Sequence, residues 1–218
     1  AEVDHLHHVV APAVAHEHHV ARLDVAVDHA GVVGRREALA ELAQHPDVQR
    51  VCLNLAADYR GLPVFDEWDI TAKFEMLYGE GSLDETAAER WTTLTKLTDQ
   101  LHACDMMVLS TPMWNFSIPW HLKRWIDCVV QGRLTFEFVD GQFRGLLAGR
   151  QAVILTSRDG MYTTGTDLAA LDFQMPYLRQ ILGFIGFNPI HEVIAEPMMM
   201  AGPEAGVAAL DAAIVRAQ

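Results

Sequence analysis

The sequence predicts an α/β protein with a doubly wound parallel sheet and helices on both faces. Short apolar runs such as Cys104 to Ser110 and Gln151 to Thr156 are typical of strands that are buried on both sides. Stretches with apolar residues at helical spacing, such as Trp120 to Val130, follow them. Because the two kinds of segment alternate along the chain, a parallel sheet with crossover helices is favoured.

Length, charge and composition restrict what the chain can do. At 218 residues it fits one α/β domain with a single core. Its net charge of −13 argues against nucleic acid and against an anionic membrane surface as partners, since both require basic patches. The apolar runs are far shorter than the ~20 residues that a membrane span needs. Three cysteines without a secretion signal favour a cytoplasmic protein.

Residues 1–50 are atypical and His-rich. They use only the ten amino-acid types whose codons can begin with G or C, and they hold eight of the eleven histidines. We hypothesise that this stretch reflects a shifted reading frame or an unrelated fusion, and that residues 51–218 form the domain. A single uninterrupted frame with ordinary codon positions in the coding DNA would contradict this hypothesis. The imidazoles could also bind Zn²⁺ or Ni²⁺, although adventitious binding is the simpler interpretation.

The remaining elements follow in chain order. Within the first fifty residues, Arg22 to Val27 is expected to supply a strand and Arg35 to Ala43 a helix. Ser82 to Glu85 is a capping-box pattern that opens a helix through His102, with a core-facing apolar stripe. Further strands are expected at Arg50 to Leu55 and His191 to Ala195. A hairpin is expected at Leu134 to Phe138 and Gly141 to Gly145, with Asp140-Gly141 as its turn. Further helices are expected at Lys73 to Leu77, Leu171 to Leu182 and Gly206 to Ala217.

The most informative stretch is TPMWNFSIP, residues 111–119, which connects a buried strand to a helix. Ser117 stands where an N-cap belongs, and Pro119 is near the first helical turn. The stretch is therefore a loop at the carboxyl end of a strand, where open α/β sheets bind ligands. Its Met, Trp, Asn and Phe side chains suit a flat, partly polar ring. A second loop, Ser157 to Gly160, is expected at the same edge.

Several motifs together resemble the FMN-dependent NADH-azoreductase and NAD(P)H quinone oxidoreductase family. They are MWNFSIPWHLKRWID, LTFEF, GLLAGRQAVILTSRDG and PYLRQILGFIGF, and the resemblance covers about Val51 to Met200. It implies a flavodoxin-like fold, FMN as cofactor, NAD(P)H as hydride donor and a quinone or azo compound as acceptor. The reaction implied is a ping-pong, two-electron hydride transfer. A homodimer with its active site at the subunit contact is implied as well.

The resemblance also assigns the residues that bind the flavin, while it names no catalytic residue. Asn115 would donate and accept hydrogen bonds along the polar edge of the ring. The N-terminus of the following helix would favour an anionic reduced flavin. His121, in that helix, is expected at the surface or an interface. The assigned residues are Pro112, Met113, Trp114, Asn115 and Phe116 in the first loop and Ser157, Arg158, Asp159 and Gly160 in the second.

Two departures from the family pattern leave alternatives open. Asp159 stands where relatives commonly have a glycine, and its carboxylate would disfavour a nearby anionic hydroquinone. The Ser-rich loop that holds the FMN phosphate is replaced by Asp28 to Arg36, which contains no hydroxyl. The protein could therefore be a degenerate, flavin-free relative without enzymatic activity, or a metal-binding protein that uses the His-rich start. Uptake of FMN by the purified protein would favour the enzyme.

Overall fold

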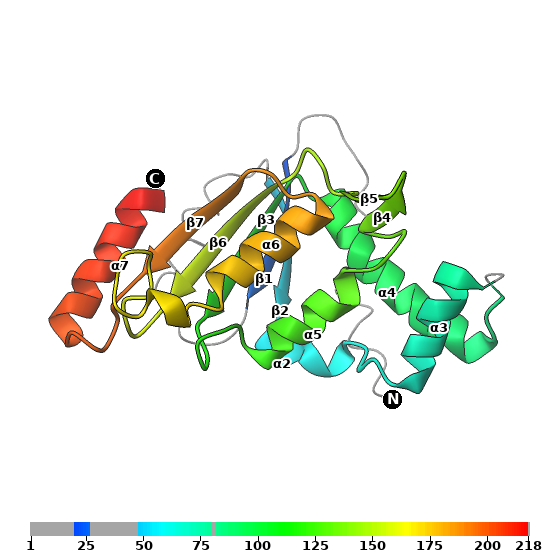
Figure 1. Ribbon diagram of the computed structural model, residues 1–218, viewed down its shortest axis with the longest axis horizontal. Helices are drawn as coiled ribbons and strands as arrows, with labels where there is room; N and C mark the ends of the chain where they lie inside the picture. The colour runs from blue at the N-terminus through cyan, green and yellow to red at the C-terminus, as the bar shows by residue number, and fades with distance from the viewer. Residues whose placement is uncertain (1–19, 27–47, 80–81, 218) are drawn as a thin grey trace.

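A computed structural model describes residues 20–26, 48–79 and 82–217, which contain a five-stranded parallel sheet in the order β2-β1-β3-β6-β7 (Figure 1). From β1 the chain moves outward to β2 and then crosses to the other side for β3, β6 and β7. This reversal confirms the doubly wound topology and places the switch point between β1 and β3. The strands are β1 (Val20–Ala26), β2 (Val48–Asn54), β3 (Met106–Pro112), β6 (Gln151–Ser157) and β7 (Ile190–Ala195), with a separate antiparallel pair, β4 (Phe136–Val139) and β5 (Gln142–Gly145).

Helices follow the strands, and Figure 1 shows α5 and α6 in front of the sheet, with α7 beside its β7 edge. None of the described helices is long and apolar enough to cross a membrane. The helix expected at Arg35 to Ala43 lies outside the described residues. The helices are α2 (Leu55–Asp58), α3 (Glu67–Tyr78), α4 (Glu85–Ala103), α5 (Trp120–Val129), α6 (Met175–Ile185) and α7 (Pro203–Ala217), with short 3-10 turns η3 (Tyr59–Gly61) and η4 (Ala169–Leu171).

The core lies between the sheet and the apolar faces of α4, α5 and α6. The stripe predicted on α4 faces it, although one member, Trp91, is only partly buried. Cys104 and Cys128 are buried, and burial raises the pKa of their thiols to about 11 and about 12. Both thiols therefore stay protonated at neutral pH and pack as small apolar side chains.

The hairpin between α5 and β6 confirms a prediction made from two residues. Asp140 and Gly141 have φ values of 53° and 77°, so both central residues of the turn are left-handed. That conformation matches the right-handed twist of the flanking strands, and Asp-Gly adopts it more readily than most residue pairs. The ladder from Phe136 to Gly145 follows from this turn.

Two helix starts differ from the sequence prediction. The N-cap of α4 is Asp84, whose carboxylate accepts from the Ala87 amide at 2.8 Å, so the assignment of Ser82 was wrong. Helix α3 is longer than predicted because Asp66 caps it by accepting from the amides of Trp68 and Asp69. In both cases the aspartate just before the helix accepts from backbone amides of the first turn, two or three residues further along the chain.

Replacement of the Asp84 cap provides a direct test of this assignment. Asp84→Ala is expected to lower the free energy of unfolding by ~1 kcal/mol, because the Ala87 amide loses its acceptor. The matched control Ser82→Ala is expected to change it by less than ~0.5 kcal/mol, since exposed residues outside caps contribute little. Urea denaturation of the two variants measures both values. A larger loss for Ser82→Ala would restore the capping box inferred from the sequence.

Candidate functional site

The carboxyl ends of three adjacent strands lie at the same level. Pro112 of β3 pairs with Ser157 of β6, and Ser157 pairs with Ala195 of β7. The ladder continues one residue further, since the Met113 amide donates to the Ser157 carbonyl at 3.3 Å and the Arg158 amide donates to the Ala195 carbonyl at 3.0 Å. The two loops predicted from the sequence are therefore neighbours, and the segment after β7 lies beside the second.

The first loop contains a strained two-residue turn. Trp114 and Ser117 exchange two backbone hydrogen bonds of 2.9 Å, which close the turn over Asn115 and Phe116. The φ values of these two residues are 47° and 66°. Asn tolerates this left-handed region, but a bulky Phe adopts it rarely and at a cost in free energy. Strain of this kind is concentrated at functional sites.

The turn explains why one prediction from the sequence was wrong. Ser117 was expected to cap the following helix, but its backbone closes the turn with Trp114. The N-cap position of α5 is instead Pro119, whose carbonyl accepts from the Lys123 amide at 3.1 Å. The helix consequently begins at Trp120, and the loop before it is longer than the serine suggested.

A cavity of about 690 Å³ opens beside this turn. Its volume falls in the range of sites for small organic ligands and cofactors, and its walls are mostly apolar and aromatic. Asn115 and Lys123 supply polar groups, and Lys123 is paired with Asp127 at 2.5 Å. The lining residues are Trp114, Asn115, Ser117, Ile118, Pro119, Trp120, Lys123, Phe173 and Tyr177.

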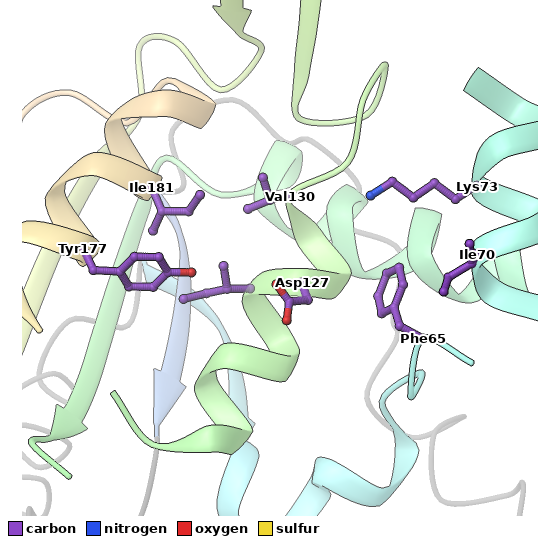
Figure 2. A pocket seen from close by; sticks show the side chains of 8 residues that line it. Phe65, Ile70, Lys73, Asp127, Val130, Tyr177 and Ile181 are labelled. Atoms are coloured by element: carbon purple, nitrogen blue, oxygen red, sulfur yellow. The ribbon is translucent and has the colours of Figure 1, made fainter. Parts of the chain in front are cut away.

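Tyr177 also lines a second, smaller cavity of about 340 Å³ between α3, α5 and α6. Figure 2 shows its side chain projecting from α6 with the hydroxyl directed toward α5. Burial, together with the negative charge of Asp127, raises the pKa of Tyr177 to about 12. The hydroxyl therefore remains protonated at neutral pH and can act as a hydrogen-bond donor. The other lining residues are Phe65, Ile70, Lys73, Ile126, Asp127, Val130 and Ile181.

His121 was expected at the surface or an interface, and at only 8% exposed it is buried within the described residues. Its ring stacks on Trp120, with centroids 4.0 Å apart, and lies 5.8 Å from Trp114 and 5.3 Å from Tyr59. Trp114 and Trp120 both line the larger cavity. His121 therefore supports the aromatic wall of the site from behind.

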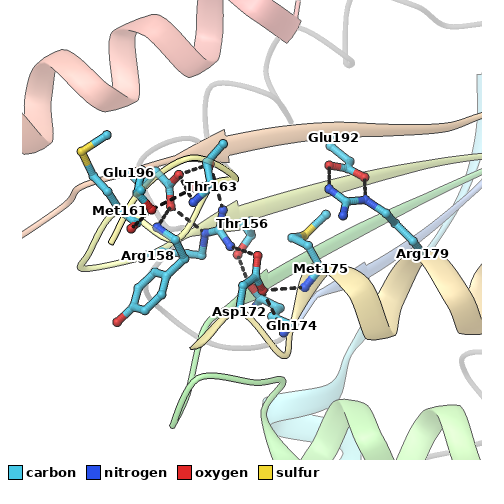
Figure 3. A network of polar contacts seen from close by, with 12 residues as sticks. Thr156, Arg158, Met161, Thr163, Asp172, Gln174, Met175, Arg179, Glu192 and Glu196 are labelled. Atoms are coloured by element: carbon cyan, nitrogen blue, oxygen red, sulfur yellow. Dashed lines mark hydrogen bonds and ion pairs between the residues drawn. The ribbon is translucent and has the colours of Figure 1, made fainter. Parts of the chain in front are cut away.

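In the second loop, Arg158, which the resemblance assigns to the flavin site, is buried. Its guanidinium bonds Asp172 at 2.7 Å through Nη1 and lies 3.0 Å from Glu196 through Nε (Figure 3). The side chain is fully enclosed, so its positive charge is balanced by these carboxylates of the protein. Arg158 therefore holds the loop in place from the inside.

The neighbouring residues of the second loop have different environments. Asp159 has an exposed side chain, while its carbonyl accepts from the Met200 amide at 3.1 Å. Gly160 is buried, and a Cβ at this position would lie 2.8 Å from the sulfur of Met200 and 2.9 Å from a methyl carbon of Leu168. A larger residue at this position would therefore require the Met200 and Leu168 side chains to shift.

Three residues at the site were missed in the sequence: Asp172, Gln174 and Glu196. Gln174 is fully buried, donates to the Pro112 carbonyl at 2.8 Å and accepts from the Thr156 hydroxyl at 3.0 Å. Asp172 accepts from the Gln174 and Met175 amides at 3.0 Å and so caps the start of α6. An aspartate just before a helix is a usable N-capping signal. It was missed because the helix was predicted to begin at Leu171, which placed Asp172 inside the helix.

The candidate phosphate loop, Asp28 to Arg36, lies outside the described residues, as do the histidines of residues 1–19. The strand before it is described. Ala26, the last residue of β1, pairs with Ser110 of β3 and with Asn54 of β2. The first fifty residues therefore supply a central strand of the sheet, as expected, and this strand ends at the same edge as the two loops.

A family model that describes a flavodoxin-like fold matches residues 34–218. The chain belongs to this family. An FMN-dependent NADH:quinone oxidoreductase of Nitratidesulfovibrio vulgaris is 37% identical over 173 residues, which cover 79% of this chain and 80% of that protein. One from Pseudomonas fluorescens is 35% identical over 196 residues, covering 84% of this chain and 89% of that protein. The crystal structure of an azoreductase from Bacillus anthracis superimposes with a TM-score of 0.78 at 26% identity, covering 91% of this chain and 98% of that one.

These similarities confirm both the flavodoxin-like fold and the family expected from the sequence motifs. The candidate site stands where this topology favours ligands. In a flavodoxin-like sheet the ligand lies at the switch point, and the strained turn at Asn115 and Phe116 follows β3, one of the two strands that flank it.

Gln174 joins the ends of β3 and β6, and its removal should be costly. Gln174→Ala is expected to lower the free energy of unfolding by ~1–3 kcal/mol, because a buried carbonyl and a buried hydroxyl lose their partner. Gln180→Ala, at an exposed position on the same helix, is the matched control and should change it by less than ~0.5 kcal/mol. Urea denaturation measures both, and equal losses would show that the two bonds do not stabilise the fold.

Proposed function

We propose that this protein is an FMN-dependent NAD(P)H oxidoreductase that reduces quinones or azo compounds by two-electron hydride transfer in a ping-pong sequence. The strained turn at Asn115 and Phe116, at the ligand-binding edge of the sheet, carries the proposal. Relatives that cover most of the chain are named FMN-dependent NADH:quinone oxidoreductases, and they favour an enzyme over a flavin-free, non-enzymatic protein. NADH is the donor that their names give.

The described residues fit the ring portion of FMN. Asn115 is exposed at the turn, and within the described residues its side-chain amide makes no hydrogen bond, so both of its polar atoms can face a ligand. The Met113 amide ties this loop to the Ser157 carbonyl, which brings both loops to one ligand. Trp114 and Phe173 supply flat apolar walls. The assigned residues of both loops are thus proposed to bind the flavin, with Arg158 and Gly160 acting by packing from within.

When bound, FMN supplies a ring that accepts a hydride from NAD(P)H and passes it to the acceptor. The residues of this chain bind and orient the reacting molecules. Helix α5 begins at Trp120, so its N-terminal partial charge favours negative charge at the cavity. The Tyr177 hydroxyl, which is protonated at neutral pH, can donate to a carbonyl oxygen of an acceptor. The aromatic walls reduce the access of water to the ring.

We further propose that the protein is a cytoplasmic homodimer. Helix α3 and the loop before it expose several large apolar side chains, and the smaller cavity in Figure 2 lies beside them. Exposed apolar patches of this kind mark protein contacts. The exposed residues are Val64, Trp68, Ile70, Phe74 and Tyr78.

The homodimer can be tested by light scattering coupled to size exclusion. Ile70→Glu places a charge in the apolar patch and should shift the mass from dimer to monomer, since an unpaired charge buried in an interface is costly. Val207→Glu, an equally apolar position that is exposed on α7, is the matched control and should leave the mass unchanged. A wild-type monomer, or an unaltered dimer in Ile70→Glu, would contradict this interface.

The flavin assignment can be tested at Asn115. Reconstitution with FMN should give a yellow protein that oxidises NADH in the presence of a quinone. Asn115→Ala should weaken FMN binding by ~1–3 kcal/mol, because polar groups on the ring lose their partner. Asn188→Ala, at an exposed position before β7, is the control. Fluorescence titration measures the affinities, and equal values for the two variants would remove Asn115 from the binding site.

A further inference from the structure

One buried carboxylate, that of Glu196, holds the segment 161–165 in place. Its Oε2 accepts from the Tyr162 amide at 2.9 Å, and its Oε1 accepts from the Thr163 amide at 3.0 Å and from the Thr163 hydroxyl. The Glu196 side chain is only 7% exposed. Figure 3 shows the carboxylate of Glu196, beyond the end of β7, directed toward this segment and Arg158.

Arg158, from the second candidate loop, also contacts Glu196 and the segment 161–165. We call Glu196, Arg158 and the residues Tyr162 and Thr163 that they hold the clasp. Its Nε lies 3.0 Å from Glu196, its Nη2 donates to the Thr163 hydroxyl at 3.4 Å, and its guanidinium lies 5.8 Å from the centre of the Tyr162 ring. The guanidinium pairs with the buried carboxylate, which accepts from both amides. The clasp therefore joins the loop after β6 to the segment after β7.

The clasp is connected to the candidate flavin site through one aromatic contact. The Tyr162 ring packs edge-to-face on Phe116, with centroids 6.2 Å apart, and Phe116 is the strained residue of the first loop. Met161, Thr163 and Gly165 are exposed, and the Thr166 hydroxyl donates to the carbonyls of Met161 and Thr163 at 2.7 and 2.8 Å. Glu196 is the side chain that bonds the Tyr162 and Thr163 amides, so it fixes the backbone from which the Tyr162 ring reaches Phe116.

We infer that Glu196 is a positioning residue of the flavin site. It fixes Tyr162 beside Phe116, and it thereby keeps the loops after β3 and β6 in one relative geometry. The inference rests on the proposed function. A second ion pair, between Glu192 of β7 and Arg179 of α6, provides a comparison (Figure 3). The side chain of Arg179 is 51% exposed, so this pair contributes little to structure.

The experiment compares Glu196→Gln with the matched control Glu192→Gln in the full chain. Fluorescence titration should show FMN binding weakened by about tenfold in Glu196→Gln only, since charge-assisted bonds to the segment are lost. Hydrogen exchange should rise at the Tyr162 and Thr163 amides in the same variant. The visible absorption of bound FMN should also shift toward that of free FMN, which a loss of global stability alone does not produce.

A milder pair of variants covers the case in which Glu196→Gln does not fold. Thr163→Val removes only the hydroxyl contact and should weaken FMN binding by about threefold, while Thr164→Val, at the next exposed position, should not. If FMN binding is the same in each variant and its control, the inference is overturned while the proposed function stands. Faster exchange without any change in FMN affinity overturns it as well. If the wild-type protein takes up no FMN, the proposed function fails, and the inference fails with it.

Discussion

The charge of Arg158 is the constraint on which the site depends. A guanidinium that is closed off from water must be paired, since an isolated buried charge is strongly destabilising. Asp172 and Glu196 provide the pairing from two different segments. Each carboxylate also accepts from backbone amides, Asp172 from those that open α6 and Glu196 from Tyr162 and Thr163. One buried charge thus determines where three segments of the chain meet.

This convergence is possible because of strand register. Pro112, Ser157 and Ala195 pair across β3, β6 and β7, so the residues that follow them leave the sheet at one level. Strands of a parallel sheet all end at the same edge, and a shift of one residue would turn each following side chain to the other face. Gln174 strengthens this arrangement, because its amide joins Pro112 to Thr156 between the two strand ends.

Local patterns in the sequence predicted the fold and both site loops, whereas contacts between distant segments could not be predicted. Asp140-Gly141 identified the hairpin because its left-handed turn depends on those two residues alone. Ser117 was misread because its backbone bonds Trp114, a choice that is made by the turn and not by the serine side chain. The burial of Arg158 could not be predicted, because its partners, Asp172 and Glu196, are distant in sequence.

The strain in the first loop is offset by the same segment that pairs Arg158. Phe116 keeps its left-handed backbone because Trp114 and Ser117 close the turn and because the Phe173 amide donates to the Phe116 carbonyl at 3.0 Å. Phe173 stands between Asp172 and Gln174, so the residues that fix the strand ends also hold the turn. A rearrangement of the turn would therefore break the bond between the Phe173 amide and the Phe116 carbonyl. The site is preorganised because its strain and its supports belong to one network.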